Sequence, residues 1–114
     1  MLMDIIKARH SIRKYTSAQI SRDDLEKILE AGNFAPNAGG GQRSMILQAT
    51  ELGIASCIIS RGYETFDSEE GRRLMNEWGV PEGYACQGFV ILGYIDGEQP
   101  KSKPRKSGRI KIVE

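Results

Sequence analysis

The residues best suited to chemistry in this chain stand near its start, in the stretch Arg9-His10-Ser11-Ile12-Arg13. A guanidinium group can bond two phosphate oxygens at once, and a serine adds a hydroxyl and a backbone N–H, so the pattern suits an anion. A short apolar-periodic segment precedes it, which predicts that the basic residues lie where a helix gives way to a loop. Taken alone, such a cluster is more typical of a solvent-exposed basic turn.

A second basic cluster lies in the tail, about residues 98–114, which begins with a turn-rich stretch. Its cations are Lys101, Lys103, Arg105, Lys106, Arg109 and Lys111. With two prolines and little apolar surface this segment cannot form a core, which predicts an extended tail. Composition alone favours a solvated tail or a weak nucleic-acid contact over a specific site. Alternation of Ile110, Lys111 and Ile112 also allows residues 109–113 to add as a strand to an exposed sheet edge, its own or a partner's.

Composition narrows the class of protein. The 114 residues are enough for one domain, residues 1–114, and a net charge of +1 points to neither nucleic acid nor a membrane surface. The apolar runs are too short to span a bilayer and no signal-peptide core is present, which predicts a soluble, cytoplasmic protein. Cys57 and Cys86 stand in apolar contexts that favour buried free thiols, and with His10 as the sole histidine we expect no metal site.

The hydrophobic pattern predicts helices at residues 3–8, 21–32, 44–52 and 69–78, and strands at 54–59 and 87–94. Ser21 is the expected N-cap and Gly32 the expected end of the second helix. In the fourth helix Trp78 is expected to face inward. The continuous apolar run of the last strand predicts a central position covered on both faces. The glycine-rich loop at 35–42 suits either close approach to a ligand or a flexible connector.

Four segments in this order resemble the nitroreductase family of flavin enzymes. They are Arg-His-Ser-Ile-Arg-Lys-Tyr at 9–15, Ala-Pro-Asn-Ala-Gly-Gly-Gly-Gln at 35–42, Ala-Thr-Glu-Leu-Gly-Ile-Ala-Ser-Cys at 49–57, and Leu-Gly-Tyr followed by Lys-Pro-Arg-Lys within 92–106. The resemblance implies an α+β fold with a mainly antiparallel sheet flanked by helices. It also implies FMN as cofactor, NAD(P)H as hydride donor, a nitroaromatic, quinone or similar acceptor, and an intertwined homodimer.

The resemblance further implies which residues bind FMN. They are Arg9, His10, Ser11, Arg13, Pro36, Asn37, Ala38, Gly40, Gln42, Ser60, Arg61, Lys103 and Arg105. By this likeness Arg9, Ser11 and Arg13 grip the phosphate and ribityl chain, His10 lies beside them, and the two tail cations close on the phosphate. The loop at 36–42 passes along the flavin ring, and backbone N–H groups around residues 60–61 face its reactive edge. No catalytic side chain is needed, because the cofactor carries the hydride chemistry.

The chain departs from the family pattern in two places. The family commonly has an asparagine two residues before the loop glutamine, where Gly40 stands here, so a backbone N–H or Asn37 would have to substitute. Several tens of residues that members carry after that glutamine, including a Pro-Trp pair and two strands, are absent between Gln42 and Arg43. The chain is either a naturally shortened member or lacks an omitted segment. The apolar faces that would be exposed favour omission, which predicts a Cα separation there well beyond ~3.8 Å.

Three functions follow from these observations. The first is an FMN-dependent oxidoreductase that takes hydride from NAD(P)H and passes it to an aromatic acceptor in a ping-pong cycle. The second is a flavin-binding or interaction module without turnover, which the shortened sequence would explain. The third is a small basic-tailed nucleic-acid binder. Near-zero net charge and the absence of aromatic residues among the tail cations weigh against this third function.

Overall fold

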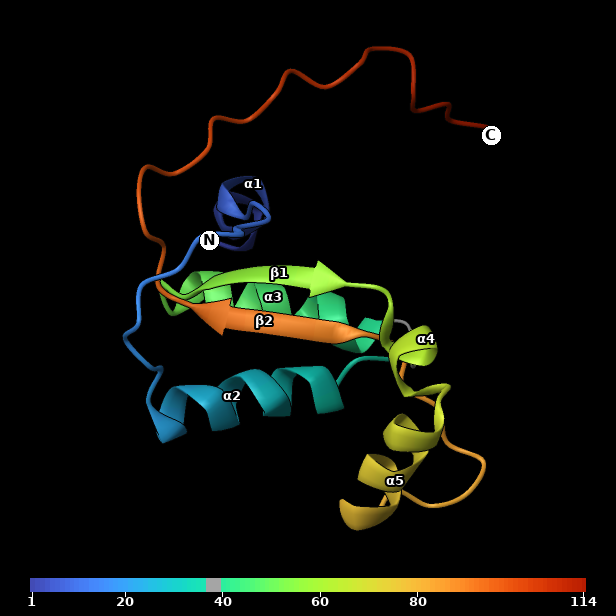
Figure 1. Cartoon of the computed structure of the whole chain (residues 1–114). Coiled ribbons are helices and arrows are strands. Elements are labelled where there is room, and N and C mark those ends of the chain that lie inside the picture. Colours follow the sequence, from blue (N-terminus) through green and yellow to red (C-terminus); the bar gives the residue numbers. More distant parts are fainter. Residues whose placement is uncertain (37–39) are drawn as a thin grey trace.

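A two-stranded antiparallel sheet lies at the centre of the fold, with helices arranged around it (Figure 1). The computed structural model describes residues 1–36 and 40–114. The strands are β1 (Ala55–Ile59) and β2 (Phe89–Gly93), and Cys57 pairs with Ile91 at the middle of the ladder. Helix α3 (Gly41–Glu51) packs against both strands and against α1 (Leu2–Ala8) and α2 (Arg22–Asn33). The fold is therefore α+β, and α3 is the element that most others contact.

Helix α2 forms where the local signals predict it. The Ser21 hydroxyl accepts a hydrogen bond from the Asp24 N–H at 3.1 Å, and two acidic residues in the first turn favour the helix dipole. Ile28 is fully buried in the core. The sequence predicted that the helix ends at Gly32, and it ends one residue later, at Asn33. Gly32 lies in the last turn, where a Cβ would lie 2.8 Å from Cγ of Met45, so this glycine permits close approach of α2 to α3.

Helix α3 begins at Gly41, earlier than the predicted start at Ser44. Gln42 and Arg43 are consecutive residues of this one helix. The expected wide separation of their Cα atoms is therefore wrong, and the chain is continuous where a segment was thought to be omitted. The region that carries Gln42 is therefore the first turn of α3.

The core lies between the sheet and the two helices α2 and α3. Ile28, Ala49 and Ile54 form its buried centre, and Leu92 of β2 packs against them. Sequence analysis predicted that β2 is central and covered on both faces, and the structure contradicts this. The sheet has two strands, and Ile91 of β2 is 39% exposed, because the helices cover only one of its faces.

The segment that follows α1 crosses the sheet and ties it to the N-terminus. The Ile12 N–H donates to the Ser56 carbonyl of β1 at 3.0 Å, and the Thr16 N–H donates to the Tyr94 carbonyl after β2 at 2.8 Å. Between them the Tyr15 hydroxyl donates to the carbonyl of Ile12. Burial raises the pKa of this phenol, and the nearby Cys57 raises it further. Residues 9–13 are thus held in a fixed register beside β1.

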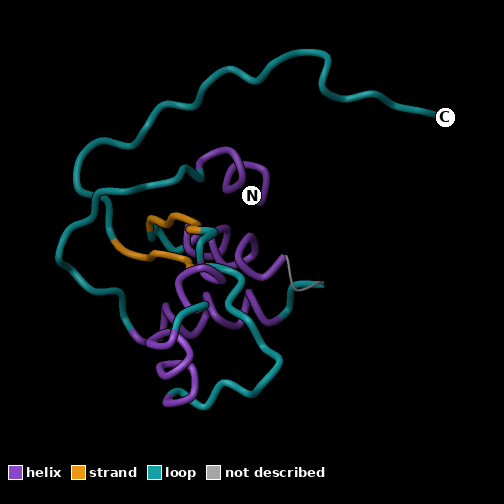
Figure 2. Tube along the Cα trace, turned by 45° about the vertical axis from the view of Figure 1, so that its right-hand side comes forward, coloured by secondary structure: helices purple, strands orange, loops and turns teal. Residues whose placement is uncertain are grey.

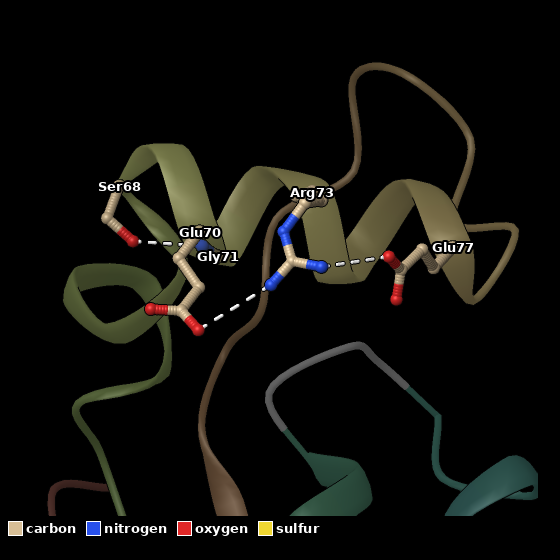
Figure 3. A network of polar contacts seen from close by, with 5 residues as sticks. All are labelled: Ser68, Glu70, Gly71, Arg73 and Glu77. Carbon is tan, nitrogen blue, oxygen red and sulfur yellow. Dashed lines mark hydrogen bonds and ion pairs between the residues drawn. The ribbon is translucent and has the colours of Figure 1, made fainter.

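Two short helices, α4 (Gly62–Phe66) and α5 (Glu69–Glu77), lie between the strands in sequence. Figure 3 shows how α5 is stabilised: Ser68 caps it by accepting from the Gly71 N–H at 3.0 Å. Arg73 pairs with Glu77 at 3.0 Å and with Glu70 at 3.6 Å, all on the exposed surface. Exposed pairs of this kind contribute about 0.3 to 0.5 kcal/mol each.

The sequence did not predict α4, and it placed Trp78 in the core. Trp78 is instead 64% exposed, and its ring meets Phe66 of α4 edge-on with the centroids 5.8 Å apart. Gly71 explains how the two helices approach each other, because a Cβ there would lie 2.5 Å from Cα of Phe66. Helices α4 and α5 thus form a small satellite unit rather than part of the main core.

The tail leaves the body of the protein (Figure 2). Residues 98–114 contain neither helix nor strand, and all are exposed. The radius of gyration is 16.6 Å, whereas a compact chain of this length would have one of ~13 Å. The predicted strand at 109–113 does not form on the chain's own sheet, and its addition to a partner's sheet stays a prediction. Within the described residues no helix is long and apolar enough to cross a membrane.

Candidate functional site

A groove lies between the end of α1, the start of α3 and strand β1, with a volume of about 470 Å³. Its lining residues are Ile6, Arg9, Ser11, Arg43, Ile46, Leu47 and Ile58. Four of these are aliphatic and none is acidic. Ligand sites in proteins typically combine apolar walls with a few convergent polar groups, and this groove has that composition.

The backbone of residues 9–12 explains why Arg9 and Ser11 share the groove. α1 ends at Ala8, and Arg9 adopts an extended conformation with φ −66° and ψ 129°. Ser11 then forms a parallel bridge with Ser56 of β1. Alternate residues of an extended chain point to opposite sides, so Arg9 and Ser11 face the groove while Ile12, only 5% exposed, is buried.

The positive charge of the groove is not neutralised by the protein. No ion pair within residues 1–36 and 40–114 includes Arg9, Arg13 or Arg43. Cations over apolar walls create a stronger field than they would in open water, which favours binding of an anion. Arg13 is exposed and does not line the groove, although alternation along the chain places it on the same side as Arg9 and Ser11.

His10 faces away from the groove and contacts the base of the tail. Its Nδ1 lies 2.7 Å from the Ala8 carbonyl oxygen, and its Nε2 lies 3.0 Å from Oγ of Ser102. The Gln99 amide donates to the same Ala8 carbonyl at 3.3 Å. The Gln99 Nε2 also lies 3.2 Å from Nδ1, so the His10 ring contacts Ala8, Gln99 and Ser102. We call this set of contacts the His10 clasp.

Replacing His10 by alanine should release the base of the tail. The ring's polar contacts with Ala8, Gln99 and Ser102 are lost, and nothing else in the described contacts holds Ser102. We expect amide hydrogen exchange around residues 99–102 to accelerate, while exchange in β1 stays unchanged. Ser102→Ala, which removes only the contact at Nε2, should give a smaller acceleration. Equal protection in wild type and His10→Ala would show that the clasp does not order the tail.

The far end of β1 brings together two other predicted site residues, Gln42 and Ser60. Gln42 of α3 donates through Nε2 to the Phe89 carbonyl of β2 at 3.3 Å. A Cβ on Gly88 would lie 2.7 Å from that Nε2 and 3.5 Å from Cα of Ser60. The loop glutamine and the residue after β1 therefore meet beside Gly88, where only a glycine fits.

The remaining predicted residues have the following positions. Gly40 is the N-cap of α3, Arg61 is the N-cap of α4, and Pro36 is exposed before the loop. Asn37 and Ala38 lie outside the described residues. Lys103 and Arg105 are exposed on the tail, just beyond the His10 clasp. Among the described contacts, those between the tail and residues 8–10 reach no further than Ser102.

Sequence analysis missed two features of this region. Arg43 lines the groove, and it was overlooked because the helix was expected to begin after it. A periodicity count extended back to Gly41 would have placed it in the first turn. The second feature is a hollow of about 260 Å³ behind Arg9 and His10, which includes Ser56. The Ser56 hydroxyl is buried without a partner among the described residues, and no sequence pattern marks it.

Residues 6–44 match the model of the nitroreductase family. A protein from Archaeoglobus fulgidus, named among the NADH dehydrogenase/NAD(P)H nitroreductases, is 50% identical over 40 residues. That match covers 35% of this chain and 23% of the relative, so the chain spans about a quarter of the curated relative's length. Similarity in sequence is therefore concentrated in the part that carries Arg9, Ser11 and Gln42.

Similarity in structure extends over nearly the whole chain. A nitroreductase with bound FMN from Bacteroides fragilis has a TM-score of 0.90 and 28% identity, covering 99% of this chain and 98% of that one. A nitroreductase with bound FMN from Desulfitobacterium hafniense has a TM-score of 0.78 at 18% identity, with the same coverage. The expected fold is confirmed.

Proposed function

The chain has the fold of the nitroreductase family and resembles its members in sequence; from this premise we propose that it is an FMN-dependent oxidoreductase. It passes hydride from NAD(P)H to a small aromatic acceptor, such as a nitroaromatic compound or a quinone. The observation that supports this most directly is the groove, in which guanidinium groups and Ser11 stand beside apolar walls without a compensating carboxylate.

The residues of the groove fit FMN in charge, polarity and size. Arg9 would bind the phosphate and Ser11 would donate to the phosphate or ribityl chain, because both line the groove. Ile46, Leu47 and Ile58 supply apolar wall. A volume of about 470 Å³ lies within the ~300 to 1,000 Å³ range of ligand pockets. Arg13 would approach from the exposed side of the same extended segment.

The end of β1 would hold the ring of the cofactor. Ser60 and Arg61 follow the strand directly, and both residues are exposed. We propose that their backbone N–H groups face a flavin edge. Gln42 and Ser60 lie beside Gly88, where a Cβ would lie 2.7 Å from Nε2 of Gln42. FMN, when bound, supplies the hydride transfer, and the protein's residues bind and orient it. No acid, base or nucleophile among the side chains is therefore required.

The tail completes the proposed site. Lys103 and Arg105 come directly after the His10 clasp, and we propose that they add charge at the phosphate, within one subunit or across a homodimer. The exposed apolar residues Ile110, Ile112 and Val113 would then pack on the partner subunit. The whole chain acts as one flavin-binding domain, with its tail as the connecting segment.

A visible spectrum of the freshly purified protein tests this function. We expect flavin absorbance, or its appearance when FMN is added, and loss of the yellow colour when NADH or NADPH is added without oxygen. Restoration of the colour by a quinone would complete the cycle. A coloured protein that neither nucleotide bleaches would favour the second candidate, a flavin-binding module without turnover, which the shortened chain supports. A colourless protein that takes up no FMN contradicts both.

A further inference from the structure

We infer that Arg43 is a second phosphate-binding cation of the groove, and that together with Arg9 it makes the site selective for a phosphorylated flavin over riboflavin. This inference rests on the proposed function and names the chemical class of ligand that the groove selects. Arg43 is not among the residues that the sequence resemblance assigns to the cofactor. Arg43 comes from the start of α3 and Arg9 from the end of α1, and both line the groove.

Two positively charged side chains, those of Arg9 and Arg43, line the same groove. Arg9 and Arg43 have no carboxylate among the lining residues, and no ion pair of the described part of the chain includes either. Because both line the same groove, an anion bound there interacts with two positive charges, and a phosphate monoester carries close to two negative charges near pH 7. A dianion therefore suits this pair better than a single carboxylate would.

The start of α3 places Arg43, an exposed residue, at the groove. It lies in the first turn of α3, where long side chains lean back toward the N-terminus of the helix. That first turn contains no acidic residue, so nothing in it neutralises the guanidinium. Ile46 and Leu47, on the following turn, form the apolar wall of the same groove. The start of α3 at Gly41 is what carries Arg43 into this position.

Binding of FMN and riboflavin to wild type and Arg43→Gln tests the inference, measured by flavin fluorescence at fixed ionic strength. Glutamine keeps the helix propensity and most of the side-chain length. We expect Arg43→Gln to bind FMN roughly 10-fold more weakly while riboflavin affinity is unchanged, because only the phosphate loses a charge-assisted bond. Lys27→Gln is the matched control: it removes one exposed positive charge from α2, away from the groove, and should change neither affinity.

The outcomes separate this inference from the proposed function. An unchanged ratio of FMN to riboflavin affinity in Arg43→Gln overturns the role of Arg43, as does an equal change in Lys27→Gln. If wild type binds neither flavin, the proposed function fails, and inorganic phosphate then serves as the probe. Phosphate should raise the melting temperature of wild type above that in chloride of equal ionic strength, and Arg43→Gln should abolish the difference. No stabilisation of wild type by phosphate overturns the inference as well.

Discussion

Replacing Arg9 and Arg13 together by alanine should weaken FMN binding by about two to four orders of magnitude. Each charge-assisted hydrogen bond to a phosphate contributes on the order of 1.5 to 3 kcal/mol, and every 1.4 kcal/mol is a factor of ten in affinity. Arg9 is half-buried at the groove, so water replaces its contact only in part. The dissociation constant from a flavin fluorescence titration measures the effect.

A matched control separates specific binding from general attraction. The double variant Lys7→Ala, Lys14→Ala also removes two positive charges, from residues that flank the 9–13 stretch. Both lysines are exposed, and neither lines the groove. Raised salt should weaken FMN binding to this control and to wild type alike, since exposed charges are screened within ~10 Å at 0.1 M. If the control loses as much affinity as the arginine variant, the phosphate does not bind at Arg9 and Arg13.

Single substitutions would divide this effect between the two arginines. Arg9 lines the groove and Arg13 does not, so Arg9→Ala should account for the larger part. The opposite order would mean that the phosphate lies outside the groove, on the exposed side of residues 9–13. Either result is informative, because the extended backbone turns both side chains to the same side.

Local signals in the sequence were sufficient to predict the helices that carry their own caps. Ser21 and Ser68 each accept a hydrogen bond from the backbone N–H three residues later, which is the pattern that marks a helix start. The start of α3 was harder to predict, because Gly40 caps it without a side-chain bond. Short α4 lacks a side-chain cap as well, and no local pattern predicts it.

Tertiary contacts explain the features that could not be predicted. Whether an apolar strand is covered on one face or two depends on how many helices remain to cover it, so β2 looked more buried in sequence than it is. Gly32 carries the usual signal of a helix end, yet it serves the close approach of Met45. The basic cluster at 9–13 could be singled out by residue type, and its role at a cofactor stays a prediction, whereas the presence of Arg9 and Arg43 in one groove depends on the packing of α1 against α3.

Ile28 of α2 packs against α3, the helix that supplies part of the groove's lining. Ile28→Ala should lower the free energy of unfolding by about 2 to 5 kcal/mol, a large fraction of the ~5 to 15 kcal/mol typical of a domain. Ile28 is fully buried with Ala49 of α3 and Ile54, so truncation leaves a cavity beside α3. Alanine is the better helix former, but that gain is below ~1 kcal/mol.

Leu29 provides the control, since it is the next residue of the same helix and is 54% exposed. Leu29→Ala should change the unfolding free energy by no more than about 0.5 to 1 kcal/mol, because little apolar area returns to water. Urea denaturation followed by circular dichroism measures both variants, and a fall in the midpoint without a change in slope identifies a loss of stability. Equal losses in the two would mean that α2 does not bury Ile28 against α3. Because α3 carries Gln42 and Arg43, saturating FMN should recover part of the stability lost in Ile28→Ala, by mass action on the folded state.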